Sequence, residues 1–458
     1  MQWANFLHFY QPPTQKPYWV KRITDEAYRP ILRGMLEHPN ARTTMNISSI
    51  LVELWEQNGA SDVIDLVRQL LAKGQIELTG SAKYHPLLPK LPDAEIIRQI
   101  DLNTETHKKY FGDLYKPRGF FPPEMGISEH VARLASEHGF EWIIMDELSY
   151  DKKMNGPMDP STIYTLSGTS DFKLFFRERR MSYKILSGQL GTSSLLIDSL
   201  GDRLKNHEYL LTAMDGETFG HHRPGMELLL FEIYGSKKVE TVLMSDLAST
   251  FPSRRSIGLL PSTWALMEKD LERDVPFARW DDKDNEIHAL QWQLVDVAIH
   301  SLDHASNKEG EYDNARHLLD RALHSDQFWW ASAKPWWSLE MIERGAKELR
   351  DVVNLTPGAD EASKKKAQDL YQRIVFKGFD WQRDGVVDAL SKQEDEEVRQ
   401  RSDEGLPKLP KAEITKIIKN LEREMKLVAA RQEFERAAQL RDRIKEIHQY
   451  EDNDATTP

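Results

Sequence analysis

The sequence predicts an α/β fold: a barrel or near-barrel of about seven strand–helix units, then a helical domain and a C-terminal helical hairpin. Three observations support this. Up to about residue 260, short apolar runs alternate with amphipathic stretches, which is typical of a mostly parallel sheet. From about 285 to 390, apolar residues recur at helical spacing. Two further amphipathic segments follow a charged, proline-containing stretch.

Seven apolar runs of strand length lie in the first part, at residues 3–9, 42–47, 75–79, 119–121, 142–145, 174–176 and 210–214. Amphipathic stretches such as 48–71 and 94–110 separate them. In barrels of this kind the chemistry lies beyond the carboxyl ends of the strands. Six polar residues fall there: His8, Asn46, Glu77, Glu124, Asp146 and Asp215. We therefore expect the functional site at that end of the barrel.

Composition limits the possible ligands. The chain has 458 residues, of which 40% are hydrophobic, and it contains no cysteine. This length accommodates a barrel with helical additions, and the lack of cysteine excludes disulfides and thiolate metal sites. The net charge of -12 argues against nucleic-acid binding, because phosphate contacts need clustered Lys and Arg. A neutral, hydroxyl-rich ligand such as a sugar fits better.

The beginning of the chain shows no targeting signal. Its first eight residues lack the basic start and the long apolar run of a signal peptide. No later run reaches membrane-spanning length. We therefore expect a cytoplasmic protein with no membrane association.

Changes in composition predict the domain boundaries. We expect a barrel domain over 1–260 and a helical domain over 261–390 that completes the substrate cleft. The charged and then proline-containing stretch predicts a linker at 391–410, followed by a helical hairpin at 411–450 and a disordered tail at 451–458. A hairpin of this size has too little core to stand alone, so we expect it to dock or to dimerise.

Aromatic residues are concentrated around the helical domain, at Trp264, Trp280, Trp292, 328–330 and 336–337. Most of these tryptophans should fill a helical core, because Trp is highly buried on average. Aromatic rings also stack on the apolar faces of pyranoses. Trp280 is therefore a candidate for contact with a substrate ring.

Two carboxylates follow buried strands and open into loops that contain Gly or Pro. Glu124 lies in Phe120-Phe121-Pro122-Pro123-Glu124-Met125-Gly126, and Asp215 lies in Leu210-Leu211-Thr212-Ala213-Met214-Asp215-Gly216-Glu217. Two acids at the ends of two strands of one barrel can converge on a small cleft. Glycoside hydrolysis uses such a pair, with one acid at the anomeric carbon and the other handling the leaving-group proton.

Four short segments, in this order, carry a resemblance to a known family. They are His8-Phe9-Tyr10-Gln11-Pro12; Gly74-Gln75-Ile76-Glu77-Leu78 with His85-Pro86; Pro122-Pro123-Glu124-Met125-Gly126; and Met214-Asp215-Gly216-Glu217-Thr218-Phe219-Gly220. Together they resemble the motifs of glycoside hydrolase family 57, over roughly the first 350 residues. The resemblance implies an incomplete TIM-like β/α barrel and activity on α-glucans.

The resemblance also implies a role for each motif. Glu124 would be the nucleophile of a retaining mechanism and Asp215 the acid/base, with a carboxyl separation of about 5 to 5.5 Å. His8, Gln11, Glu77 and His85 would line the sugar site. For His8 and Glu77, support of a neighbouring residue is an alternative role. Tyr10 stands where the family often has a second histidine, and a phenol cannot carry a proton as imidazole does near pH 7.

Three further residues are candidates for sugar contacts. Glu217 shares a strand face with Asp215 if the strand continues, so the sequence alone does not separate them. Asp146, at the end of a strand, would bind sugar or position a neighbour, and Arg177 and Arg180 are weaker candidates nearby. His221, beside His222 after the fourth motif, would contact substrate or cap its loop.

No metal or cofactor is expected. His300 and His304 have the i, i+4 spacing that can place two imidazoles on one metal, but no third ligand is suitably spaced. A metal-dependent carbohydrate deacetylase remains an alternative, since such enzymes use related barrels. The Asp-Asp pair typical of those enzymes is missing from the first strand.

The last helices have a resemblance of their own. Leu421 to Lys426, and then Phe434-Glu435-Arg436-Ala437-Ala438-Gln439-Leu440-Arg441-Asp442, resemble the UVR motif of bacterial excision-repair subunits and some protease adaptors. That motif is a helical hairpin that pairs with another protein's hairpin. It implies a protein partner or self-association through 411–450. Packing on the same chain is the alternative.

The expected function is a retaining glycoside hydrolase or transglycosidase that acts on oligo- or polysaccharide α-glucans, of the α-amylase, 4-α-glucanotransferase or branching type. Glu124 and Asp215 would carry the chemistry. Besides the deacetylase, the alternative is a catalytically silent glycan-binding or regulatory protein that recruits a partner through its UVR-like hairpin.

Overall fold

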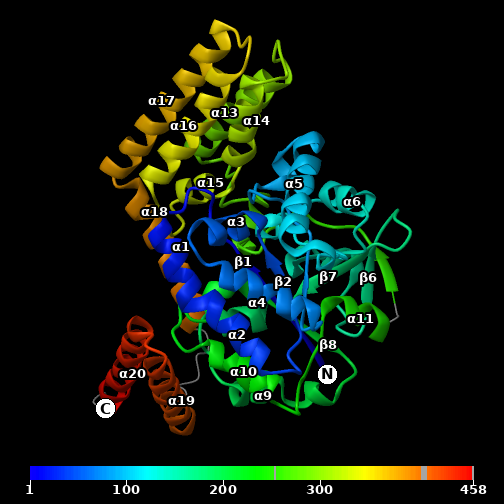
Figure 1. The fold of residues 1–458 in the computed structure, drawn as a ribbon, viewed down its shortest axis with the longest axis vertical. Helices are drawn as coiled ribbons and strands as arrows, with labels where there is room; N and C mark the ends of the chain where they lie inside the picture. The colour runs from blue at the N-terminus through cyan, green and yellow to red at the C-terminus, as the bar shows by residue number, and fades with distance from the viewer. Residues whose placement is uncertain (252–253, 404–409, 456–458) are drawn as a thin grey trace.

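The computed structural model describes residues 1–251, 254–403 and 410–455 (Figure 1). Its strands are β1 (Gln2–Phe9), β2 (Thr43–Ile47), β3 (Ile76–Leu78), β4 (Gly119–Phe120), β5 (Trp142–Asp146), β6 (Ile163–Leu166), β7 (Lys173–Arg177), β8 (Tyr209–Asp215), β9 (Glu240–Thr241) and β10 (Arg254–Ile257). The α-helices between and around them are α1 (Pro17–Ile23), α2 (Arg29–Glu37), α3 (Ser49–Gln57), α4 (Ser61–Ala72), α5 (Asp93–Phe111), α6 (Glu129–Glu137), α7 (Lys152–Asn155), α8 (Arg179–Leu186), α9 (Ser193–Leu200), α10 (Glu227–Tyr234) and α11 (Met244–Thr250). The later helices are α12 (Glu268–Glu272), α13 (Glu286–Asp303), α14 (Glu311–Ala322), α15 (Asp326–Ala331), α16 (Leu339–Leu355), α17 (Glu361–Arg383), α18 (Val386–Asp403), α19 (Lys411–Ala430) and α20 (Phe434–Ala455).

Two sheets form an incomplete barrel. In the part of the chain that the structure describes, one sheet runs β3-β2-β1-β8, with β9 beside β1, and the other runs β10-β6-β7-β5-β4. A bridge between Gly80 and Phe120 joins the β3 side to β4. The amide of Glu178, just after β7, donates to the carbonyl oxygen of Leu211 in β8 at 2.8 Å. The prediction of an α/β fold with an incomplete barrel of about seven strands is confirmed, with β6, β9 and β10 as additional strands.

The barrel interior is apolar in its middle and polar at the carboxyl ends of the strands. Phe6 of β1 and Ala213 of β8 belong to one buried cluster, which also includes residues of α11. Two positions further along each strand are His8 and Asp215, which are partners in the parallel register of β1 and β8. Because side chains two apart share a strand face, the alternation that fills the interior also directs His8 and Asp215 into one space.

The helical domain lies beside one end of the barrel (Figure 1) and shares a hydrophobic core with it. Helices α13, α14, α16 and α17 pack against one another, and Leu294, Leu319 and Leu349 are fully buried between them. The start of α15 contacts the barrel directly: the amide of Ser325 donates to the carbonyl oxygen of His85 at 3.0 Å. The helical domain therefore forms part of the wall at the carboxyl ends of the strands.

The C-terminal hairpin, α19 and α20, docks on the barrel of the same chain. Arg436 donates to the fully buried Glu227 of α10 at 2.5 Å. Leu421 sits against Gly225, where an added Cβ would lie 2.1 Å from the leucine Cδ2 atom. Asn420 donates to Glu232 at 2.6 Å. Of the two outcomes expected for the hairpin, the structure shows docking on its own chain.

Two boundaries differ from the sequence prediction. Helix α18 continues to Asp403, so the first part of the predicted linker at 391–410 is helical; residues 404–409 lie outside the described residues. No Gly or Pro interrupts this stretch before Gly405, and the buried Glu394 anchors it by accepting from Arg279 at 2.7 Å. Helix α20 continues to Ala455, so residues 451–455 of the predicted disordered tail are helical. Positions 456–458 of that tail lie outside the described residues.

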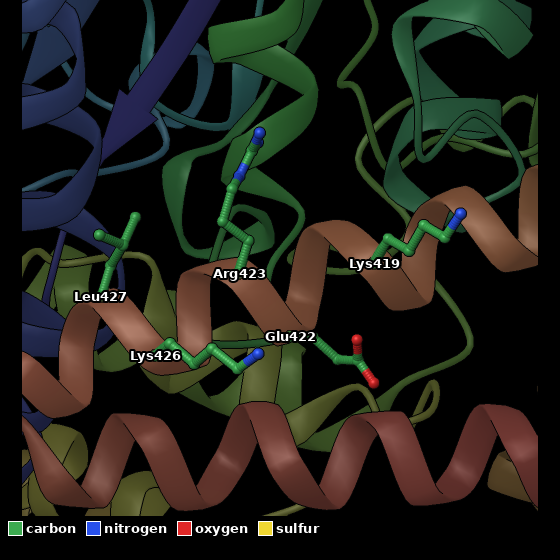
Figure 2. Close-up of a pocket in the computed structure, with 5 residues that line it drawn as sticks. All are labelled: Lys419, Glu422, Arg423, Lys426 and Leu427. Carbon is green, nitrogen blue, oxygen red and sulfur yellow. The ribbon is translucent and has the colours of Figure 1, made fainter.

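Two hollows border the hairpin. A cavity of about 880 Å³ lies between the hairpin and the α1–α2 region, and both Glu26 and Gln439 line it. A smaller hollow of about 320 Å³ lies on α19, and Figure 2 shows Lys419, Arg423 and Lys426 spreading from the helix around it. Neither hollow includes Glu124 or Asp215. Among the described helices, none is both long and apolar enough to cross a membrane.

Candidate active site

Glu124 lies in a single turn, η4 (Pro123–Met125), directly after β4. Its φ of 60° places it in the left-handed region, which is uncommon outside glycine. Trp264 contacts it twice: the backbone amide donates to the carbonyl oxygen of Glu124 at 3.1 Å, and the indole Nε1 donates to Oε2 at 2.7 Å. Strained backbone of this kind persists where the surroundings hold it. Trp264 thus fixes both the main chain and the carboxylate of Glu124.

Glu124 and Asp215 are both half-buried, and their charges interact. Burial, together with the charge of Asp215, raises the pKa of Glu124 to about 8, although the Trp264 hydrogen bond opposes this rise. Burial also raises the pKa of Asp215 to about 6, against the favourable charge of Arg177. Between these two values the pair holds one proton, which is the protonation that an acid and a nucleophile require together.

The structure distinguishes Asp215 from Glu217, which the sequence does not. The carboxylate of Glu217 accepts from Gln11 Nε2 at 2.9 Å and from the hydroxyl of Tyr28. Burial and the charge of Asp215 raise the pKa of Glu217 to about 8. Within the described residues, no side chain or amide donates a hydrogen bond to the Asp215 carboxylate. Asp215 is therefore the better placed of the two to reach an oxygen of a ligand.

Asp146, at the end of β5, binds two arginines. Its Oδ2 accepts from Arg177 Nε at 2.7 Å, and its Oδ1 accepts from Arg179 Nη1 at 2.8 Å. Arg177 also donates to the carbonyl oxygens of Ala213 and Trp264, at 3.0 and 3.1 Å. The fully buried Asp146 thus positions a neighbour, one of the two roles considered for it, and the charge it fixes is the one that opposes the rise in the pKa of Asp215.

His8 and His85 form a neutral pair beside Glu124. His8 Nδ1 lies 2.9 Å from Asn46 Oδ1, and His8 Nε2 lies 3.1 Å from His85 Nε2. Burial lowers the pKa of His8 well below its usual value and lowers that of His85 to about 4. Because the Asn46 oxygen can only accept, Nδ1 of His8 is the donor, and His85 Nε2–H must donate to His8 Nε2. His85 Nδ1 lies 3.7 Å from Glu124 Oε1.

The helical domain supplies an acid that the sequence analysis did not identify. Asp326, at the start of α15, accepts from the hydroxyl of Tyr10 at 2.6 Å and pairs with His324 Nδ1 at 3.1 Å. Tyr10 in turn stacks on His85 with ring centroids 4.0 Å apart. Burial disfavours the ionised form, but the hydrogen bonds from His324 and Tyr10 and the charge interactions with the two neighbouring histidines together outweigh it and lower the pKa of Asp326. Tyr10 therefore links the first motif to this acid.

Three candidates lie away from this cluster. Glu77 accepts from Thr44 Oγ1 at 2.7 Å and from the amide of Ser245 in α11 at 3.0 Å. In the register of β2 it pairs with Thr44, two residues before the level of Asn46. His221 pairs with Glu26 through Nδ1 on the side that faces the hairpin. Trp280 is fully buried in the helical core and packs against Trp329 at 5.2 Å, so it exposes no ring face to a ligand here.

The two histidines considered for a metal lie side by side, one in α13 and the other just after it. The ring centroids of His300 and His304 lie 4.1 Å apart, and His304 Nδ1 pairs with the carbonyl oxygen of His300 at 2.9 Å. Across the described ranges, no group of three or more His, Cys, Asp or Glu side chains is arranged to hold a metal ion.

The sequence analysis did not propose three residues that belong to the candidate active site, namely Trp264, Arg179 and Asp326. Arg177 was a weaker candidate, whereas its companion Arg180 is exposed. An Arg-rich segment directly after β7 was a usable signal for Arg179, because strand ends face the site. Trp264 reaches it from a turn and Asp326 from the start of α15, both outside the barrel strands, and no local pattern marks them.

Comparison with known families supports both resemblances drawn from the sequence. The model of glycosyl hydrolase family 57 matches residues 7–259, more than half of the chain. The model of the UvrB/uvrC motif matches residues 415–450.

Two relatives illustrate the range of the family match. An α-amylase from Pyrococcus horikoshii is 27% identical over 264 residues, which cover 54% of this chain and 40% of the relative. A 4-α-glucanotransferase from Thermococcus kodakarensis is 23% identical over 310 residues, which cover 62% of this chain and 46% of the relative. The chain thus spans less than half the length of these two curated relatives.

Solved structures share the fold. The family 57 branching enzyme from Thermococcus kodakaraensis, crystallised with glucose, has a TM-score of 0.63 at 14% identity and covers 82% of this chain and 96% of its own. The 4-α-glucanotransferase from Thermococcus litoralis has a TM-score of 0.58 at 18% identity, over 77% of this chain and 59% of its own. The incomplete barrel, the ordered motifs and the match over residues 7–259 lead to one conclusion: the chain belongs to glycosyl hydrolase family 57.

Proposed function

We propose that this protein is a retaining glycoside hydrolase or transglycosidase that acts on α-glucans, with Glu124 as nucleophile and Asp215 as acid/base. The observation that carries the proposal is the contrast between two half-buried, interacting carboxyls. Trp264 holds Glu124 at 2.7 Å, whereas the Asp215 carboxylate keeps its hydrogen-bonding capacity for a ligand. The names of the relatives, α-amylase and 4-α-glucanotransferase, support the substrate class.

In the first step, Glu124 attacks the anomeric carbon while Asp215 gives its proton to the glycosidic oxygen, and the remaining sugar leaves. In the second step, Asp215 removes a proton from water or from a sugar hydroxyl. That oxygen attacks the same carbon and releases Glu124, so the configuration is retained overall. Whether water or a sugar accepts the glycosyl group decides between hydrolysis, transfer and branching.

The first step of this mechanism depends on which of the two carboxyls, Glu124 or Asp215, carries their shared proton. In the free protein the pKa of Glu124 is raised further than that of Asp215, to about 8 against about 6. The first step needs the opposite distribution, with Glu124 ionised and Asp215 protonated. Substrate binding would have to move the proton from Glu124 to Asp215, and a glycosidic oxygen that accepts from Asp215 favours that form.

Neutral histidines suit the sugar site beside this pair. With the pKa of His85 lowered to about 4 by burial, the His8–His85 pair is uncharged near pH 7 and adds no cation next to Glu124. His85 Nδ1, which lies 3.2 Å from Ser325 Oγ, is the ring nitrogen of the pair left to accept from a hydroxyl group. Gln11 Oε1, which accepts from Gln15 Nε2 at 2.9 Å, has a second lone pair for the same purpose. We propose these residues, with Tyr10 and Asp326, as the lining that receives the sugar ring under attack.

Product analysis on a panel of α-linked oligosaccharides tests the proposal. Wild type should form α-configured products, seen by proton NMR before mutarotation. Glu124→Gln and Asp215→Asn should each lose turnover while keeping the circular dichroism spectrum. The matched controls are Glu129→Gln and Asp202→Asn, whose carboxylates are 40% and 93% exposed. Unchanged turnover in both site variants would overturn the mechanism.

The two alternatives give different results in the same assay. Turnover that survives exhaustive chelation contradicts a metal-dependent deacetylase, which would also release acetate rather than sugars. Glucan binding without turnover by the wild type, across all linkages of the panel, would instead support a silent glycan-binding protein.

A further inference from the structure

A short segment connects the C-terminal hairpin to the fourth motif. It is the π-helical turn η1 (Thr24–Tyr28), which joins α1 to α2. On its inner side, Tyr28 donates its hydroxyl to Glu217, and Glu26 pairs with His221. The main chain also passes close by, because a Cβ on Gly220 would lie 2.0 Å from the carbonyl oxygen of Glu26. The fourth motif therefore packs directly on η1.

On its outer side, η1 meets the hairpin. Gln439 of α20 donates to Oε1 of Glu26, the carboxylate oxygen that also accepts from Arg22 Nε at 2.8 Å. The other oxygen, Oε2, is the one that pairs with His221. Glu26 is 8% exposed, so these contacts are made largely out of water. One carboxylate thus joins a hairpin residue to a residue just after the fourth motif.

The hairpin is firmly attached next to this contact. Arg436, three residues before Gln439, reaches the fully buried Glu227 at 2.5 Å. Leu421 closes over Gly225, in the loop that follows the fourth motif. A loss of the Gln439 contact alone would leave these two anchors in place. The contact can therefore be tested without undocking the hairpin.

We propose that Glu26 is a positioning residue for the fourth motif, and that the docked hairpin, through Gln439, holds it in place. The proposal rests on the proposed function only in that Asp215 and Glu217 belong to the reacting site. Burial would favour a neutral Glu26, but hydrogen bonds from His221, Arg22 and Gln439 outweigh it and lower the pKa of this carboxyl. An ionised Glu26 binds all three donors at once.

The structural consequence is local. With Gln439 gone, Glu26 keeps one fewer donor, and η1 is freer to move relative to Gly220 and His221. The loop hydrogen bond from the amide of His222 to the carbonyl oxygen of Glu217, 2.8 Å long, reports this movement. The chemistry should suffer through the placement of Asp215 rather than through substrate affinity, because neither Gln439 nor Glu26 contacts the sugar-site lining proposed above.

The test compares three full-length variants. Gln439→Ala removes the donor, Gln439→Lys keeps a donor for Glu26, and Arg441→Ala is a control on the same helix with a 55% exposed side chain. In Gln439→Ala, the His222 amide should exchange with deuterium about tenfold faster, the factor expected for one lost hydrogen bond to a charged group. Its kcat should fall by about tenfold, less than the 10²-fold that a 1 Å misplacement can cost, with KM nearly unchanged. Gln439→Lys should restore both values, and Arg441→Ala should match wild type.

These variants distinguish the positioning role of Gln439 and Glu26 from the proposed glycosidase function. Wild-type exchange at His222 in Gln439→Ala would overturn the positioning role, whether or not the protein turns over a glucan. Equal loss in Gln439→Ala and Gln439→Lys would also overturn it, because the donor would then not matter. Loss of turnover in Glu124→Gln together with unchanged kcat in Gln439→Ala would leave the glycosidase function standing and remove the hairpin from it.

Discussion

Trp264 donates its indole N–H to Oε2 of Glu124 at 2.7 Å and its backbone amide to the carbonyl oxygen of the same residue at 3.1 Å. The indole hydrogen bond favours the ionised carboxylate against burial, which raises the pKa of Glu124 to about 8. The role of nucleophile that we propose for Glu124 needs both an anion and a fixed direction. Trp264 contributes to both.

Trp264→Phe keeps an aromatic ring and removes the indole donor. The pKa of Glu124 should then rise further, so less of the enzyme holds an ionised nucleophile near neutral pH. We expect kcat/KM to fall by about tenfold at pH 7, the factor for one lost hydrogen bond to a charged group. The loss should be smaller at higher pH. Trp336→Phe, at a tryptophan that is 58% exposed, is the control. An equal loss in both variants would contradict the role of Trp264.

The rate should depend on pH as a bell with apparent pKa values near 6 and 8, from Asp215 and Glu124 acting as a pair. Below both values the pair holds two protons and lacks a nucleophile. Above both it holds none and lacks an acid. A pH profile of kcat/KM measures these limbs. Glu217→Gln separates the two candidate acids: it should keep a basic limb, and loss of that limb would assign the acid role to Glu217 instead of Asp215.

Asp146→Asn should destabilise the fold. Asp146 is fully buried and balances Arg177 and Arg179. Removing one partner of a buried ion pair leaves an uncompensated charge and costs about 3 to 5 kcal/mol. Urea unfolding measures the loss. The control, Asp202→Asn, breaks a pair whose side chains are 93% and 81% exposed, and its cost should stay below about 1 kcal/mol. Comparable costs for the two variants would contradict this account.

Glu124→Gln should raise the melting temperature at alkaline pH. The folded-state pKa of Glu124 is raised to about 8, so the folded protein binds this proton more tightly than the unfolded chain does. Its contribution is fully present below the ordinary glutamate pKa and is lost as pH rises through about 8. A neutral amide avoids that loss. We expect a Tm gain of at least about 2 °C at pH 8 and a smaller one at pH 5. Glu129→Gln, at a side chain that is 40% exposed, is the control, and an equal gain in both variants would contradict this account.

The strands and the central acids were predictable because they follow local rules. Short apolar runs mark β1 and β8, and the two-residue period of a strand directs His8 and Asp215 into the same space. The family resemblance then gave the fold, which the structure and the comparisons confirm. In the sequence, Glu77 resembled His8 and Asp215 because it also lies on a predicted strand. Its strand is only three residues long, however, and Glu77 pairs with Thr44, below the level of the cluster.

The rest depends on tertiary packing that no local pattern encodes. Trp264 and Asp326 reach the site from segments 140 and 202 residues beyond Glu124. Trp280 was a candidate for contact with a substrate ring because tryptophan stacks on sugars, but it is fully buried in a helical core, as was expected for most of the tryptophans. The docking of the C-terminal hairpin was equally beyond the reach of local patterns. Its apolar residues predict that another surface covers them, but they do not identify that surface.

The contact between Trp264 and Glu124 also determines how short a fragment of this chain can be and still keep the site intact. The family match ends at residue 259, five residues before Trp264 and well before Ser325 and Asp326. A chain trimmed to that match would retain both central carboxylates and lose the indole that directs one of them. A domain swap that cuts this chain at the edge of the family match would therefore separate the acids from the groups that orient them.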